Sequence, residues 1–200
     1  MTGKLLVIVD MQNDFISGSL ANPDAADIIP NIVQLIQEWD DKILLTQDTH
    51  DASYYATQEG KNLPVKHCIE PHAGWCICDA ILDALDEKRP DDIAFIRKQT
   101  FGAINIRSEI DGRFGSAPPE EIVICGTCTD ICVISNALIL RASYPNTPIS
   151  CRIDCCAASG TTPELRKVKQ NAAIDILTSC HIAVSQIVKK EIQSSLTKYK

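Results

Sequence analysis

Several features of membrane, secreted and nucleic-acid-binding proteins are missing from this sequence. No apolar run approaches the ~18 residues that indicate a membrane-spanning helix. The run at residues 5–9 is too short for the core of a signal peptide and is followed at once by Asp10. The net charge is −7, and the lysines and arginines are scattered, which disfavours nucleic acid and anionic membranes as partners. We therefore expect a cytoplasmic protein whose ten cysteines are mostly reduced.

Phosphate-binding signals, repeats and linkers are missing as well. The segment after the first apolar run reads DMQNDF (10–15) and contains no glycine-rich loop, so nucleotide binding is disfavoured. No low-complexity stretch divides the 200 residues, which are 45% hydrophobic and 22% charged. This composition is typical of a globular chain, and we expect residues 1–200 to form a single domain.

What the sequence does contain is a regular alternation of aliphatic runs and helical patterns. The predicted strands are residues 5–9, 42–48, 91–98, 120–126, 148–154 and 181–184. Between and after them lie the predicted helices 28–39, 74–88 and 129–144, a helix capped by Thr162, and a last helix capped by Ser185 that carries Val188, Ile192 and Leu196. This order predicts a doubly wound α/β fold. A mostly parallel six-stranded sheet would have helices on both faces, in a Rossmann-type three-layer arrangement.

Reactive side chains follow four of these predicted strands. Asp10 ends the first, Asp48 and His50 end the second, Lys98 ends the third, and three cysteines follow the fourth. In doubly wound sheets ligands bind outside the carboxyl ends of the strands, where the strand order reverses. We therefore expect these groups to meet at one edge of the sheet.

The three cysteines belong to the segment CGTCTDIC (125–132). A zinc or iron–sulfur site is disfavoured because no second pair of matching spacing accompanies them. Cys125 ends an apolar run, which favours a buried packing role, and Cys128 lies in the following turn. Cys132 would lie in the first turn of a helix, where the dipole stabilises a thiolate, although a buried structural cysteine is the alternative.

A nucleophilic thiol needs a proton acceptor and a positive neighbour. Asp10 could take the proton, and Lys98 could favour both negative charges. Taken singly, Asp10 could be a cap at a strand end and Lys98 a surface lysine. Their convergence with Cys132 favours a reactive centre.

The long segment 48–73 offers a second kind of chemistry. Asp48 and His50 are two residues apart, which places both side chains on one face of an extended chain, and Glu59 and His67 follow. Two histidines and two carboxylates suit a divalent ion such as zinc, iron or manganese. Hydrogen-bonded loop residues without a metal are the alternative.

With these motifs in place, the sequence resembles the isochorismatase-like cysteine hydrolases, and within them the nicotinamidases (pyrazinamidases). The resemblance runs in order along nearly the whole chain. Its motifs are VIVDMQNDF (7–15), TQDTH (46–50), LPVKHC (63–68), KQTF (98–101), GTCTDICV (126–133) and DCCAAS (154–159).

The resemblance implies roles for individual residues. Asp10, Lys98 and Cys132 would form the catalytic triad. A cis peptide bond before Cys128 would place the backbone N–H groups of Cys128 and Cys132 as an oxyanion hole. Many relatives also form oligomers, so a homo-oligomer is expected.

The metal and pocket residues carry over in the same way. One divalent ion, zinc first and iron or manganese as alternatives, would be held by Asp48, His50 and His67. Glu59 would replace a further histidine that many nicotinamidases have in this loop. The resemblance and the sequence together suggest Phe15, Leu20 and Phe101 as pocket walls, and Leu63 stands where relatives often have an aromatic residue.

The implied function is metal-dependent hydrolysis of nicotinamide to nicotinate and ammonia, in NAD salvage, through a thioester on Cys132. Pyrazinamide would be a second substrate. Two alternatives remain open: a cysteine hydrolase of another small amide or carbamoyl compound, and a non-catalytic metal-binding α/β domain.

Overall fold

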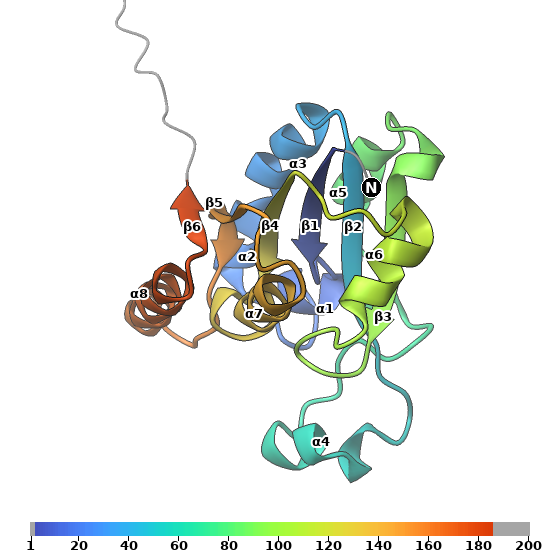
Figure 1. The fold of residues 1–200 in the computed structure, drawn as a ribbon. Helices are drawn as coiled ribbons and strands as arrows, with labels where there is room; N and C mark the ends of the chain where they lie inside the picture. Colours follow the sequence, from blue (N-terminus) through green and yellow to red (C-terminus); the bar gives the residue numbers. More distant parts are fainter. Residues whose placement is uncertain (1–2, 186–200) are drawn as a thin grey trace, which may run out of the picture.

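The computed structural model describes residues 3–185, and these build one six-stranded sheet (Figure 1). The strands are ordered β3-β2-β1-β4-β5-β6, and all five pairings are parallel. The order reverses between β1 and β4, which is the switch point at which doubly wound folds bind ligands. The predicted fold class is confirmed, and the sheet is wholly rather than mostly parallel.

The strands form where the sequence is continuously aliphatic, as expected for strands that are covered on both faces. Strand β1 is a clear case, because every residue of it after Lys4 is buried. The strand bounds are β1 Lys4–Val9, β2 Lys42–Asp48, β3 Ile93–Lys98, β4 Glu121–Thr127, β5 Ile149–Ala157 and β6 Ala183–Ser185.

Helices cover both faces of the sheet (Figure 1). One layer contains α3 and α5, which pack on each other, and the opposite layer contains α6, α7 and α8. The helix bounds are α1 Asn13–Ile16, α2 Pro23–Asp27, α3 Ile29–Gln37, α4 Gln58–Asn62, α5 Asp79–Leu85, α6 Ile106–Phe114, α7 Ile134–Ser143 and α8 Pro163–Ser179. The predicted three layers are therefore present.

Two sequence-based expectations about helices are wrong. Helix α6 was not predicted, because its polar sequence IRSEIDGRF shows a weak apolar face with Ile106 and Ile110 as its buried residues. Cys76 and Cys78 were expected inside a helix, but α5 begins only at Asp79 and both cysteines are extended. The backbone of this stretch instead bonds to the turn after β1, since Cys78 N–H donates to Met11 O over 3.0 Å.

Helix α8 begins as predicted, because the Thr162 side chain accepts a hydrogen bond from Leu165 N–H. Three large apolar residues of α8 are exposed, Leu165, Val168 and Ile176, and Val168 is the most exposed of them at 64%. The helix predicted after Ser185 lies outside the described residues. Within the part of the chain that the structure describes, no helix has the length and apolar character to cross a membrane.

Candidate active site and metal centre

The carboxyl edge of the sheet brings together the reactive residues that the sequence places after separate strands. Asp10 follows β1, Lys98 is the last residue of β3, and Cys132 lies in the turn after β4. We call these three residues the reactive group. All three are buried, and Cys132 is the most exposed of them at 6%.

Asp10 is placed by an abrupt change of backbone direction. Its φ of 49° ends β1 in the left-handed region, which non-glycine residues seldom adopt. Its backbone N–H still donates to Thr46 O on β2 over 3.2 Å, and the Thr46 hydroxyl donates to its Oδ1 over 2.6 Å. The carboxylate is thereby turned inward, with its other oxygen toward Lys98.

The Lys98 ammonium is the centre of the reactive group. Its Nζ lies 2.7 Å from Asp10 Oδ2 and 3.1 Å from Asp48 Oδ1. The same nitrogen lies 3.7 Å from Cys132 Sγ. One cation thus contacts two carboxylates and the sulfur, so the predicted convergence of Asp10, Lys98 and Cys132 is present in the structure.

Burial controls the protonation of this group. Burial raises the pKa of the Cys132 thiol well above its usual value, and the negative charge of Asp10 adds to the effect. Burial also raises the pKa of Asp10, although Lys98 opposes the shift. For Lys98, burial lowers the pKa, but the negative charges around it, that of Asp10 first, outweigh burial and leave the pKa raised. Burial thus favours the protonated thiol of Cys132, whereas a helix dipole alone would favour the thiolate.

The turn that carries Cys132 differs from the α-helical first turn that the sequence suggested. Residues Thr129–Val133 form a π-helical turn, which continues into α7 at Ile134. The peptide bond Thr127–Cys128 is cis, as the family resemblance implied. Buried Asn136 on α7 stabilises the turn, because its Nδ2 donates to Cys132 O over 2.8 Å.

The other two cysteines of CGTCTDIC do not join Cys132. Cys125 is fully buried within β4, in keeping with its predicted packing role. Cys128 is half-buried and flanks the π-helical turn at its N-terminal end. All ten cysteines are free thiols, so no disulfide involves this segment, and the group of possible metal ligands found among the described residues contains no cysteine.

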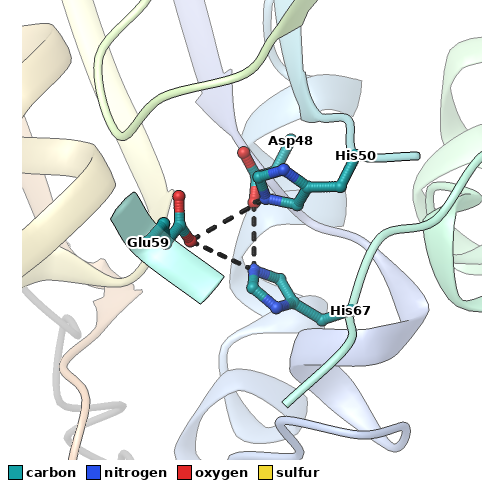
Figure 2. Close-up of side chains that lie close together, drawn as sticks. All are labelled: Asp48, His50, Glu59 and His67. Carbon is teal, nitrogen blue, oxygen red and sulfur yellow. Dashed lines mark hydrogen bonds and ion pairs between the residues drawn. The ribbon is translucent and has the colours of Figure 1, made fainter. Parts of the chain in front are cut away.

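A second cluster lies beside the reactive group and contains the four residues proposed as metal ligands. We call Asp48, His50, Glu59 and His67 the metal-ligand group. Asp48 ends β2, Glu59 lies on α4, and the histidines come from the loop segments on either side of α4. Figure 2 shows the four side chains pointing toward a common centre. One ligand atom from each lies within 4.8 Å of the others.

The distances within the metal-ligand group are those of donor atoms around one point. Asp48 Oδ2 lies 3.1 Å from His50 Nε2 and 3.3 Å from His67 Nε2. Glu59 Oε1 lies 3.8 Å and 3.5 Å from the same two nitrogens. Asp48 and both histidines are buried, whereas the Glu59 side chain is 15% exposed.

These residues fit a divalent ion on their own chemistry. Two imidazoles and two carboxylates are a donor set for zinc, iron or manganese. His67 has the orientation of a metal ligand, because its Nδ1 lies 2.9 Å from Val65 O, which directs Nε2 to the centre. Burial would lower the pKa of His67, but hydrogen bonds to Asp48 and Glu59 raise it to about 10. The centre of the cluster thus favours positive charge.

Asp48 connects the two clusters. Burial would raise the pKa of its carboxyl, but hydrogen bonds from His50 and His67 and the charge of Lys98 hold the pKa well below its usual range. One of its oxygens faces the histidines and the other accepts a hydrogen bond from Lys98. Asp48 is therefore a carboxylate shared between the two clusters.

A cavity of about 470 Å³ opens over both clusters. Its lining includes all three residues predicted as pocket walls, Phe15, Leu20 and Phe101. Leu63 and Ile131 add further apolar surface. Polar and reactive groups come from Asp48, Glu59, His67, Cys128 and Cys132. A mostly apolar cavity with a few convergent polar groups is the usual form of a small-molecule site.

Some contacts in the site were missed by sequence reasoning. Thr46 donates to Asp10, and Gln12 bonds the backbone of Asp48. Both residues lie inside the quoted motifs TQDTH and DMQNDF, but only the three-dimensional pairing of β1 with β2 shows what they contact. Ser159 also lines the cavity, with its backbone N–H donating to Asp130 over 2.7 Å.

Comparisons with known proteins identify a family and similar folds. The isochorismatase domain model matches residues 4–178. A nicotinamidase of Saccharomyces cerevisiae is 27% identical in an alignment that covers 68% of this chain and 80% of that protein. The pyrazinamidase/nicotinamidase structure from Streptococcus mutans superposes with a TM-score of 0.77 at 22% identity, over 92% of this chain and 100% of the other. The pyrazinamidase of Pyrococcus horikoshii, solved in complex with zinc, gives a TM-score of 0.72 at 22% identity, over 92% and 99%.

The fold and the site together define a doubly wound α/β protein with a buried thiol, lysine and aspartate at its switch point. More narrowly, the chain belongs to the isochorismatase family, since the family model spans most of its length. The predicted family is therefore confirmed.

Proposed function

We propose that this protein is a metal-dependent nicotinamidase, which hydrolyses nicotinamide to nicotinate and ammonia in NAD salvage and also accepts pyrazinamide. The observation that carries the proposal is the contact of Lys98 Nζ with Asp10, Asp48 and Cys132 at 2.7, 3.1 and 3.7 Å. Of these residues, Asp48 and Cys132 line the cavity, together with the metal-ligand residues Glu59 and His67. The similarity to nicotinamidases supports the choice of substrate, and we expect the enzyme to act in the cytoplasm.

The first half of the reaction forms a thioester. Asp10 accepts the proton of the Cys132 thiol, and the sulfur adds to the carboxamide carbon. The oxyanion that develops would accept hydrogen bonds from the backbone N–H groups of Cys128 and Cys132. Asp10 then returns the proton to the departing nitrogen, and ammonia leaves.

The second half hydrolyses the thioester. Asp10 takes a proton from water, the resulting hydroxide adds to the acyl carbon, and the carbon–sulfur bond breaks. The Cys132 thiolate recovers its proton from Asp10, and nicotinate leaves. Lys98 keeps its positive charge throughout and stabilises the negative charge as it moves between oxygen and sulfur.

The metal-ligand group lies beside this proton transfer, and Asp48, Glu59 and His67 line the same cavity as Cys132. One divalent ion, zinc first with iron or manganese as alternatives, would be held by Asp48, His50, Glu59 and His67. When bound, it would supply Lewis-acid coordination for a pyridine nitrogen. The apolar walls Phe15, Leu20 and Phe101 would contact the ring and exclude water from the reactive group.

The direct test is ammonia release from nicotinamide by zinc-loaded wild type and by Cys132→Ala. We expect turnover by the wild type and none above background by the variant. Equal rates, or no ammonia from the zinc-loaded wild type, would refute the proposal. Release from a carbamoyl compound but not from nicotinamide would instead favour a related hydrolase.

A further inference from the structure

The end of β2 lacks a backbone partner on its β1 side. Strand β1 ends at Val9, which is in register with Thr46, and the chain turns away at Asp10 after bonding Thr46 O. The hydrogen-bonding groups of successive strand residues point alternately to the two sides. Since Thr49 N–H donates toward β3, both backbone groups of Asp48 face the side that β1 has left.

The side chain of Gln12 fills this place. Asp48 N–H donates to Gln12 Oε1 over 2.7 Å, and Gln12 Nε2 donates to Asp48 O over 2.8 Å. The second proton of Nε2 goes to Trp75 O at 2.7 Å. A primary amide carries the same donor and acceptor as a peptide group. Gln12 is fully buried, and it acts as the missing strand residue beside Asp48.

The position of Asp48 matters more than that of any other backbone at this edge. Its carboxylate has one oxygen at 3.1 and 3.3 Å from the Nε2 atoms of His50 and His67, and the other at 3.1 Å from Lys98 Nζ. A shift of the Asp48 backbone would therefore change the metal-ligand group and the reactive group together.

We infer that Gln12 is a positioning residue, which holds the Asp48 backbone so that its carboxylate serves a divalent ion and Lys98 at once. The inference rests on the proposed function only for the roles of the divalent ion and of Lys98 in the reaction. Gln12 itself does not line the cavity and has no contact with the reacting atoms.

The test compares two variants that each replace a side-chain amide by an apolar group of similar shape. Gln12→Met removes the bonds to Asp48, and Asn31→Leu removes a bond to Asp154 O on β5, away from the site. Zinc affinity is measured by competition with a chromophoric chelator, and folding by the melting temperature. We expect Gln12→Met to bind zinc about 10–100-fold more weakly, the range found when the partner of a ligand is lost, and Asn31→Leu to bind as wild type.

A second readout tests whether Gln12 also affects the position of Lys98. At saturating zinc, kcat of Gln12→Met should remain below that of wild type, because Lys98 is still poorly placed. Full recovery of kcat would overturn the link to Lys98. Wild-type zinc affinity in Gln12→Met, with a lower melting temperature alone, would show a merely structural residue and overturn the inference.

Gln12→Glu keeps the test open if Gln12→Met does not fold. It retains the acceptor for Asp48 N–H but loses both donors, so zinc affinity should again fall, and wild-type affinity would contradict the inference. The zinc measurement uses no nicotinamide. A wild type that binds zinc tightly but releases no ammonia would refute the proposed function and leave this assignment of Gln12 standing.

Discussion

The reactive group and the metal-ligand group lie side by side but are built in different ways. Asp10, Lys98 and Cys132 come from the ends of three strands, and the hydrogen-bonded sheet fixes where each of them starts. His50, Glu59 and His67 come from the long connection between β2 and α5, whose regular elements are α4 and short 3₁₀ turns at Tyr54–Ala56 and Ala73–Trp75. Asp48 is the metal-ligand residue that also contacts the reactive group, through its hydrogen bond from Lys98.

This difference indicates how far the reactive group and the metal-ligand group can be altered independently of each other. A residue at the end of a strand inherits its position from the register of the whole sheet, so it changes little when a neighbouring loop changes. A loop ligand depends on local contacts such as the bond from the Tyr54 hydroxyl to Leu63 O. We therefore expect variants of the reactive group to lower kcat and variants of the metal-ligand group to lower zinc affinity. Changes to Asp48, or to Gln12, which holds its backbone, should affect both.

The largest effect should come from the proton acceptor of the reactive group. Asp10→Asn keeps the shape but cannot accept the thiol proton, so kcat should fall by about 10²–10⁴-fold. Zinc content should be unchanged, because Asp10 is not a ligand. Metal loss in this variant would show that the two groups are not separable.

A metal ligand should show the reverse pattern. His67→Ala removes one of the two imidazoles, and zinc affinity should fall by more than the roughly 10–100-fold seen when only an outer partner is lost. The thiol should persist, so mass spectrometry after iodoacetamide treatment should still find Cys132 alkylated. Full zinc content would exclude His67 from the site.

Glu59 should have a smaller effect than the histidines. Its carboxylate is the farthest of the four from its neighbours and the most exposed, with Oε1 3.5 and 3.8 Å from the two Nε2 atoms. Glu59→Gln keeps one weak oxygen donor, and we expect about a tenfold loss of zinc affinity by chelator competition. Unchanged affinity would leave Asp48, His50 and His67 as a three-residue site with an open position.

The smallest effect should come from the neighbouring thiol. Cys128→Ala keeps the backbone N–H and loses only a contact of Thr127 Oγ1 with the sulfur at 3.4 Å. Activity should stay within about 0.5 kcal/mol of wild type, or roughly twofold. A loss as large as that of Cys132→Ala, measured as ammonia release, would assign sulfur chemistry to Cys128.

Much of the site could be predicted because the chemistry follows the strand ends. Asp10, Asp48, Lys98 and Cys132 each stand at or after an aliphatic run, and parallel strands bring their carboxyl ends to one edge. The family motifs then implied which role each of these residues has. Helix α6 was missed because its packing depends on Ile106 and Ile110 meeting a neighbouring layer, which a polar sequence does not reveal.

The sequence by itself determined the class of fold and the residues able to react, since buried parallel strands and ionisable groups are written in residue type and order. Only the tertiary structure decided that Asp48 is shared between two clusters and that the Gln12 amide takes the place of a strand beside it. The physical reason is that these contacts join residues far apart in the chain, since Lys98 is 50 positions from Asp48 and Gln12 is 36 positions from it. The Gln12 contact also needs the gap that arises because β1 ends two residues before β2 does in the paired register.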